Sequence, residues 1–437
     1  MRPVVVTGAG LLHPTVRDRR GLAGAAAHGG PPGSPRIPGF DYARWFPDDG
    51  KRVKKMDRVS RLACVAALLA LRDAGLEPLP DRPRAGLVAG TQFGGLEACL
   101  SFHAELLTYG PNLVNPATFP NTAHNVAAGQ AAIRLGVEGP VLTLVSGLAA
   151  GLDAVVTGAR LVGSGRADVV LAGGFDVWLP EIGTALGSLG LLAGEGGEGG
   201  LVPAEAACFL VVESEEHAGR RGAPALGAIR GWGQASDELA GRGGVESLGA
   251  ALAAAMRRAL AAAGAESPTA LCLGTQGTER YDGAIEAACR ALPGAAGLRA
   301  RLLPKRALGE TFGAAGPLAV ASVLALSAAG ADLGDAVLVD GLAWGGSATA
   351  VVVDPHPAAR RSRRPPHTLD RPPGPPPRTV PAHGAQLVVA DLAVVGSERV
   401  QLGVEDVCDV DVGPAQGAVD GGGPAADRPG GEPGSVG

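Results

Sequence analysis

The sequence predicts an α/β fold in which strands and helices form separate layers. Short apolar segments of strand length alternate with longer alanine- and leucine-rich segments of helical length. The expected strands are Val4–Val6, Gly86–Ala89, Val169–Ala172, Ala270–Leu273 and Val337–Val339, and the clearest helices are Arg58–Ala74 and Leu248–Ala263. Strands that are separated by helices favour largely parallel pairing in a sheet that helices cover.

Two strand–turn–helix units occur in the same order in the two parts of the chain. Residues 86–92 read Gly-Leu-Val-Ala-Gly-Thr-Gln, and residues 271–276 read Leu-Cys-Leu-Gly-Thr-Gln. Farther along, Ser146–Gly151 and Phe312–Gly316 each open a helix that leads to an apolar strand. This order indicates a duplicated half-fold rather than a short-period repeat protein.

The composition changes near residue 355. The sequence before this point is apolar and globular, whereas proline, arginine and glycine dominate after it. We expect an N-terminal half at residues 1–225, a C-terminal half at 226–355 and a mostly disordered tail at 356–437.

Charge and cysteine content restrict the class of protein. The 437 residues carry a formal net charge of −5, which excludes a globally basic protein that coats nucleic acid. The six cysteines form no CxxC pair, so we predict neither a zinc site nor a disulfide framework. The chain opens directly on a strand, which favours a cytoplasmic protein without a signal peptide. The uncharged stretch Thr311–Ala331 is expected to be a buried helix rather than a membrane span.

Six glycine-punctuated segments then follow one another in a fixed order. They are 4–10 (Val-Val-Val-Thr-Gly-Ala-Gly), 55–58 with 71–75, 139–143, 165–174, Lys305 with 309–316, and 344–346 (Trp-Gly-Gly). Together they resemble the β-ketoacyl synthases of the thiolase fold. The resemblance covers roughly residues 2–353 and implies a thiolase-like, duplicated five-layered α-β-α-β-α architecture.

The resemblance also indicates where the catalytic groups of such enzymes would stand. Family members carry a cysteine nucleophile at a strand-to-helix turn, where the helix N-terminus favours the thiolate. Aligned on Gly139 and its neighbours, that position is Leu148. The two family histidines are replaced by Gln276 and Glu310, and the family lysine is retained as Lys305, which we expect to pair with Glu310.

A chain that keeps the scaffold motifs but lacks all three catalytic groups resembles the chain length factor of type II polyketide synthases. This resemblance implies a non-catalytic subunit that pairs with a cysteine-containing ketosynthase and shapes the polyketide or polyene chain tunnel. The implied partners are that ketosynthase and an acyl carrier protein, with no nucleic acid and no membrane. No cofactor is implied, since substrates arrive on the phosphopantetheine arm of the carrier.

The resemblance places the tunnel and the interface with the partner around Phe119, Asn121, Thr122 and His124. Phe119 and Thr122 are the candidate gates for the growing chain, although Phe119 could equally pack in the interface core. His124 is expected to be a polar interface residue. Trp344 takes the place of an aromatic gate, but ordinary core packing explains it better.

Other interpretations stay open. The chain could be a ketosynthase-like acyltransferase or hydrolase with altered chemistry, or a pure carrier-protein scaffold, so its status as an enzyme is uncertain. Gly8 and Gly10 lack the third glycine of a dinucleotide-binding turn, and Ser146 lacks the G-x-S-x-G context of a hydrolase. The basic run 51–55 could meet an acidic carrier protein, but a solvated helix start is the simpler explanation.

Overall fold

A computed structural model describes residues 1–194, 199–239, 242, 244–275, 277–294 and 297–356. The predicted tail at 356–437 therefore lies outside the described residues, except for His356. Gln276 also lies outside them.

Within the described residues, ten strands form one hydrogen-bonded sheet in the order β3-β2-β4-β5-β1-β6-β10-β9-β7-β8. The strands are β1 (Val4–Leu12), β2 (Ala85–Gly90), β3 (Val141–Leu144), β4 (Val169–Asp176), β5 (Ala206–Ser214), β6 (Gly227–Ser236), β7 (Ala270–Cys272), β8 (Ala300–Leu302), β9 (Val337–Leu342) and β10 (Ser347–Asp354). The α-helices are α1 (Arg19–His28), α2 (Arg58–Asp73), α3 (Leu96–Tyr109), α4 (Val126–Leu135), α5 (Ala150–Gly163), α6 (Pro180–Ser188), α7 (Glu215–Arg220), α8 (Val245–Ala263), α9 (Glu279–Arg290), α10 (Pro304–Leu308) and α11 (Ala315–Ala328).

The strand order repeats. From one outer edge of the sheet to its centre, the first five strands lie as 3-2-4-5-1. From the other outer edge to the centre, the last five lie as 8-7-9-10-6, which is the same order with each number raised by five. The two sets are joined where Val4–Val6 of β1 pairs antiparallel with Gly227–Ile229 of β6. All the strands and helices predicted from the sequence are present, and the mixed α/β fold is confirmed.

The expectation of largely parallel pairing is wrong. Parallel pairs are confined to β2 with its neighbours β3 and β4 and to β7 with its neighbours β8 and β9. The remaining pairs are antiparallel. One cause is the short connection from β9 to β10 through residues 343–346, which is a hairpin and too short for the crossover that parallel strands need.

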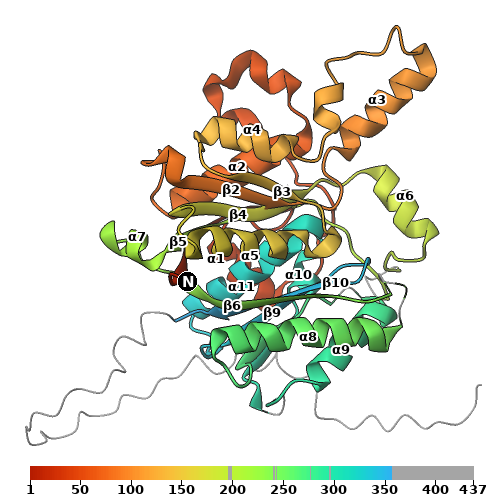
Figure 1. Cartoon of the computed structure of the whole chain (residues 1–437). Helices are drawn as coiled ribbons and strands as arrows, with labels where there is room; N and C mark the ends of the chain where they lie inside the picture. Colours follow the sequence, from red (N-terminus) through yellow and green to blue (C-terminus); the bar gives the residue numbers. More distant parts are fainter. Residues whose placement is uncertain (195–198, 240–241, 243, 276, 295–296, 357–437) are drawn as a thin grey trace, which may run out of the picture. The chain divides into compact units, whose positions relative to one another are not determined.

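Helices cover both faces of each half of the sheet (Figure 1). α5 and α11 lie between the two halves, α2 and α4 cover the outer face of the first half, and α8 and α9 cover the outer face of the second. Three hydrophobic clusters correspond to these central and outer layers. Almost every residue of α11 is buried, as predicted for the stretch 311–331. In the described part of the chain, no helix is long and apolar enough to cross a membrane.

Gly8 and Gly10 have a packing role in β1. A Cβ atom at Gly10 would lie 2.1 Å from the backbone nitrogen of Ala70 in α2, and one at Gly8 would lie 2.7 Å from the carbonyl oxygen of the same residue. Glycine therefore lets α2 lie directly on the strand, which explains this motif without a dinucleotide.

Candidate functional site

The amino-terminal ends of α5 and α11 meet at the centre of the molecule. Leu148 lies in the turn Gly147–Ala149 before α5, and Phe312 opens the equivalent turn before α11. Glycines make the contact possible, since a Cβ atom at Gly151 or at Gly174 would lie only 2.0 Å from the carbonyl oxygen of Gly313. The two halves of the chain thus contact each other through backbone at this point.

Asp176, at the end of β4, fixes this junction. Its Oδ1 accepts hydrogen bonds from the Thr91 hydroxyl (2.7 Å) and the Phe93 N–H (2.9 Å). Its Oδ2 accepts from the N–H groups of Gln92 and Gly313, each at 2.8 Å. Burial raises the pKa of Asp176, and these four donors act against that shift. The carboxylate therefore ties the loop after β2 to the turn before α11.

Leu148 is 3% exposed and belongs to the same hydrophobic cluster as Phe312. Gly147 before it has a φ of +69°, which gives the chain the sharp turn into α5. Phe312 also has a positive φ, of +51°, and its ring meets that of Phe93 edge-to-face at 4.9 Å. Hydrocarbon side chains therefore fill the turn before α5.

Glu310 is buried in an ion pair with Lys305, as expected from the sequence. Its Oε2 accepts a hydrogen bond from Lys305 Nζ at 2.6 Å, and its Oε1 accepts from the Phe312 N–H at 2.8 Å. The backbone of Glu310 also bonds to Val202 and Ala204, so this residue is fixed on both sides. Both carboxylate oxygens are occupied.

The segment that bonds to Glu310 also contacts Gly277, the neighbour of Gln276 in the sequence. Gln276 itself is outside the described residues. A Cβ atom at its neighbour Gly277 would lie 2.3 Å from the carbonyl oxygen of Gly200. Residues 200–204 thus contact both Gly277 and Glu310.

A second buried aspartate, Asp340, lies near Lys305 and was not singled out from the sequence. Asp340 of β9 accepts a hydrogen bond from the Gly274 N–H at 3.0 Å through Oδ1, while Oδ2 is buried and has no partner among the described residues. Burial raises the pKa of Asp340 to about 6, and the positive charge of Lys305 partly counters the shift. Nothing in the local sequence distinguishes this residue, because its burial depends on strands far apart in the chain.

The structure brings four of the predicted tunnel residues together around the start of α3. Phe119 is 62% exposed, and its ring lies 5.5 Å from that of Phe102 in α3. The Thr122 carbonyl accepts a hydrogen bond from Cys99 Sγ at 3.3 Å. Asn121 and His124 contact the backbone at the glycines that precede α3.

Trp344 belongs to a different region, the turn between β9 and β10. It is half-buried and contacts both outer hydrophobic clusters. Its carbonyl accepts a hydrogen bond from the Tyr281 hydroxyl at 3.3 Å. This environment is consistent with a packing role.

An apolar sheet edge leads to Leu148. β3 pairs with β2 on one side, and no described strand pairs with it on the other. Val141 and Leu142 are 40% and 41% exposed, and Val145 just after the strand is 53% exposed. The exposed edge ends three residues before Leu148.

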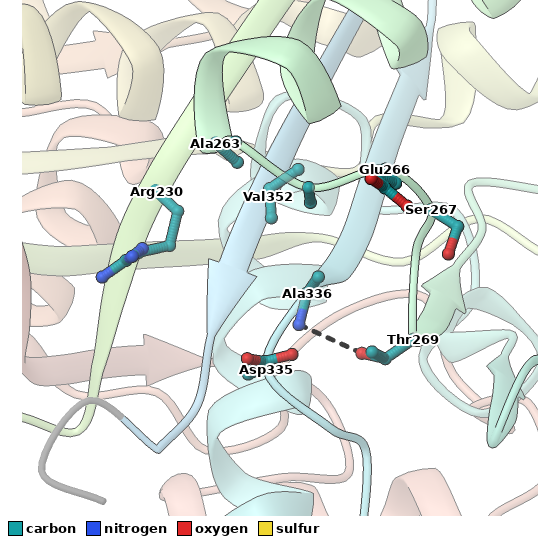
Figure 2. A pocket seen from close by; sticks show the side chains of 10 residues that line it. Arg230, Ala263, Glu266, Ser267, Thr269, Asp335, Ala336 and Val352 are labelled. Carbon is teal, nitrogen blue, oxygen red and sulfur yellow. Dashed lines mark hydrogen bonds between the residues drawn. The ribbon is translucent and has the colours of Figure 1, made fainter. Parts of the chain in front are cut away.

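A cavity of about 270 Å³ lies elsewhere, at the amino-terminal ends of β7 and β9 (Figure 2). Its lining includes Arg230, Glu266 and Asp335, and the Ala336 N–H donates to the Thr269 hydroxyl at 3.0 Å beside it. Open α/β sheets bind ligands at the carboxyl ends of their strands. This cavity is at the opposite edge from Leu148 and is not part of the candidate site.

Comparison with known protein families and sequences gives a consistent result. The family model described as "Beta-ketoacyl synthase, N-terminal domain" matches residues 37–218. A 3-oxoacyl-[acyl-carrier-protein] synthase 2 from Rhizobium meliloti is 30% identical over 306 residues, which cover 66% of this chain and 72% of the relative. The corresponding protein of Vibrio cholerae is 30% identical over 215 residues, covering 46% of this chain and 51% of the relative. The chain thus matches about half of the length of that second protein.

Solved structures extend the similarity over the whole fold. The ishigamide ketosynthase/chain length factor superimposes with a TM-score of 0.66 at 26% identity, covering 80% of this chain and 99% of that one. A β-ketoacyl synthase from Burkholderia phymatum gives a TM-score of 0.70 at 22% identity, with 81% and 99% coverage. A type II polyketide acyl carrier protein in complex with its ketosynthase gives 0.69 at 22% identity, with the same coverage.

Proposed function

This chain belongs to the β-ketoacyl synthase family, and on that premise we propose that it is a non-catalytic subunit of the chain length factor type. It would pair with a cysteine-containing ketosynthase and shape the tunnel that holds the growing polyketide or polyene chain. The condensing chemistry on the acyl carrier protein would belong to the partner. The observation that carries this proposal is the position of Leu148.

Leu148 stands where the local structure would activate a nucleophile. The turn at Gly147 and the start of α5 are retained, and a helix N-terminus favours a thiolate. A leucine side chain can neither ionise nor form a thioester. The chain thus keeps the architecture of the site without its reactive group.

Glu310 supports the same proposal. Decarboxylation of a malonyl group generates negative charge, which a neighbouring carboxylate would destabilise in a site of low dielectric constant. Glu310 is instead held by Lys305 and the Phe312 N–H, so the retained lysine is used for structure.

The cysteines of the described residues are poor candidates for a nucleophile that would replace the one missing at Leu148. Burial raises the pKa of Cys64 and of Cys289 to about 12, and it raises the pKa of Cys208 and Cys272 further. Only the thiolate is an effective nucleophile. Cys99 is half-buried, and its thiol donates to the Thr122 carbonyl. These environments favour a non-catalytic subunit over an enzyme with a displaced cysteine.

The exposed edge of β3 supports a subunit partner. An unpaired strand edge with apolar side chains normally needs to be covered. Two of the similar structures contain, by their descriptions, a ketosynthase/chain length factor and a ketosynthase with its carrier protein. We therefore place the partner at this edge, with Phe119 and Thr122 as candidate gates of the shared tunnel.

The proposal is tested by co-expressing the full chain with cysteine-containing ketosynthases of the same organism and loading the complex with an acylated carrier protein. We expect a one-to-one complex on size-exclusion chromatography and acyl mass on the partner alone. A homodimer of this chain that gains acyl mass would refute the proposal and favour the acyltransferase interpretation.

Leu148→Cys provides the matched variant. Because the turn and the helix start are retained, the new thiol should react with iodoacetamide faster than the native cysteines, while the wild-type complex is labelled only at the partner's nucleophile.

Substitution of Phe119 or Thr122 by alanine should lengthen the product of the active complex. An unchanged product would favour the pure scaffold.

A further inference from the structure

Two arginines converge on Gln234 at an open edge of the second half of the sheet. Arg160 of α5 donates to the side-chain oxygen of Gln234 at 2.8 Å, and Arg258 of α8 donates to its backbone carbonyl. The guanidinium of Arg160 also lies over the ring of Trp232, 6.0 Å from its centroid. We call the surface formed by Arg160, Trp232, Gln234 and Arg258 the Gln234 surface.

Close packing of β6 against α8 on one face directs the Trp232 and Gln234 side chains toward α5 on the other face. A Cβ atom at Gly231 or Gly233 would lie 2.5 Å or 2.0 Å from a carbonyl oxygen of α8. Because side chains alternate along a strand, Trp232 and Gln234 face the opposite side. β6 pairs with β1 only over Gly227–Ile229, so beyond that point no described strand covers this edge.

In the described part of the chain, no carboxylate pairs with the guanidinium groups of Arg160 and Arg258. Both arginines are exposed, both bond to neutral oxygens of Gln234, and neither forms an ion pair within the described residues. The carboxylate on the inner side of Gln234 is Asp153, which is 8% exposed and accepts from Gln234, Ser146 and Thr349. Two like charges held together in this way favour a carboxylate from outside.

The Gln234 surface continues from the β3 edge. Leu144 of β3, Leu161 of α5 and Trp232 are all half-buried at the rim of the central hydrophobic cluster. α5 contacts β3 and bonds to Gln234 of β6 through Asp153 and Arg160. A protein that covers β3 can therefore reach Gln234 across Thr157, Arg160 and Leu161, the residues of α5 that are not buried.

We propose that the Gln234 surface receives an acidic segment of the ketosynthase subunit that covers β3. Arginine and tryptophan are the residues that most often anchor protein interfaces, and a guanidinium binds a carboxylate in two parallel hydrogen bonds. The inference rests on the proposed function, because it names the second contact region of the same partner.

The test measures the affinity of the full chain for the ketosynthase at low and at high salt. We expect Arg160→Glu with Arg258→Glu to weaken binding at least about tenfold at low salt, and by less at high salt. The paired lysine substitutions should retain most of the binding. Arg290→Glu is the matched control, since Arg290 is an exposed arginine on α9 at the outer layer and should tolerate reversal.

Double-reversal variants that bind the ketosynthase as tightly as the wild type would overturn the inference and leave the proposed function intact. Weakened carrier-protein binding with unchanged ketosynthase binding would also overturn it, since the carrier would then be the occupant. Arg258→Gln serves as a milder variant if the reversal unfolds the chain, with thermal unfolding measured for each protein. A wild-type chain that binds no ketosynthase would refute the proposed function itself.

Discussion

The two halves of the sheet have the same strand order, yet their equivalent edge strands differ in exposure. β3 ends the first half with Val141 and Leu142 about two-fifths exposed, whereas β8 ends the second half with Ala300 and Leu302 at 5% and 4%. Arg301 of β8 is also paired with Glu286 of α9. The chain therefore buries the β8 edge and leaves the β3 edge exposed, and we propose that the partner binds at β3.

Charged substitutions should separate these two edges most strongly. Leu302→Asp places a carboxylate in the core and should lower the free energy of unfolding by more than about 4 kcal/mol. Leu142→Asp should change it by less than about 1 kcal/mol but abolish ketosynthase binding. Chemical denaturation and size-exclusion chromatography of both variants test the contrast. A Leu142→Asp chain that still forms the complex would remove β3 from the interface.

The junction of the halves gives the next largest effect. Gly151→Ala should cost about 3 kcal/mol, because its Cβ would lie 2.0 Å from the carbonyl oxygen of Gly313 in the other half. Gly129→Ala is the control, since Gly129 lies in α4 with no atom near the new Cβ, and it should stabilise the helix by about 0.5 kcal/mol. Urea titrations measure both. Equal stability of the two variants would show that the contact at Gly313 relaxes.

The two buried aspartates on equivalent strands should respond in opposite directions. Asp176 has four donors, so Asp176→Asn should destabilise the chain. Asp340 has one donor among the described residues and a pKa raised to about 6, so the folded state favours its protonated form and loses stability as the pH rises from about 4 through 6. Asp340→Asn should therefore stabilise the chain by roughly 2 kcal/mol at pH 7 and have little effect at pH 4. A pH series of thermal unfolding provides the check, and a gain at pH 4 equal to that at pH 7 would contradict the assignment.

His13 should give the smallest effect. Burial lowers its pKa, and Nε2 bonds to the Leu308 carbonyl just before the Gly309–Glu310 segment. The folded state thus favours neutral His13, whose contribution is present above pH 6.5 and is lost as the pH falls below it. His13→Gln should flatten this acid limb of the stability curve. A limb that persists unchanged in the variant would point to another group.

Much of the fold was predictable because local patterns repeat. The strands and helices follow from apolar segments of characteristic length, and the duplicated order follows from paired motifs such as 86–92 and 271–276. The pairing of Lys305 with Glu310 was also predictable, since the two residues lie five positions apart. The antiparallel pairs were missed because they depend on how distant strands meet.

The sequence by itself determined the side-chain chemistry at Leu148 and Glu310, the positions that we propose to match a nucleophile and a histidine of the family, because that chemistry is fixed by residue type. The tertiary structure alone decided that Asp176 ties two loops together, that one oxygen of Asp340 has no partner in the described part of the chain, and that Arg160 and Arg258 meet at Gln234. Each of these features joins residues distant in the chain, and burial and hydrogen bonding between such residues exist only once the sheet and its helices have assembled.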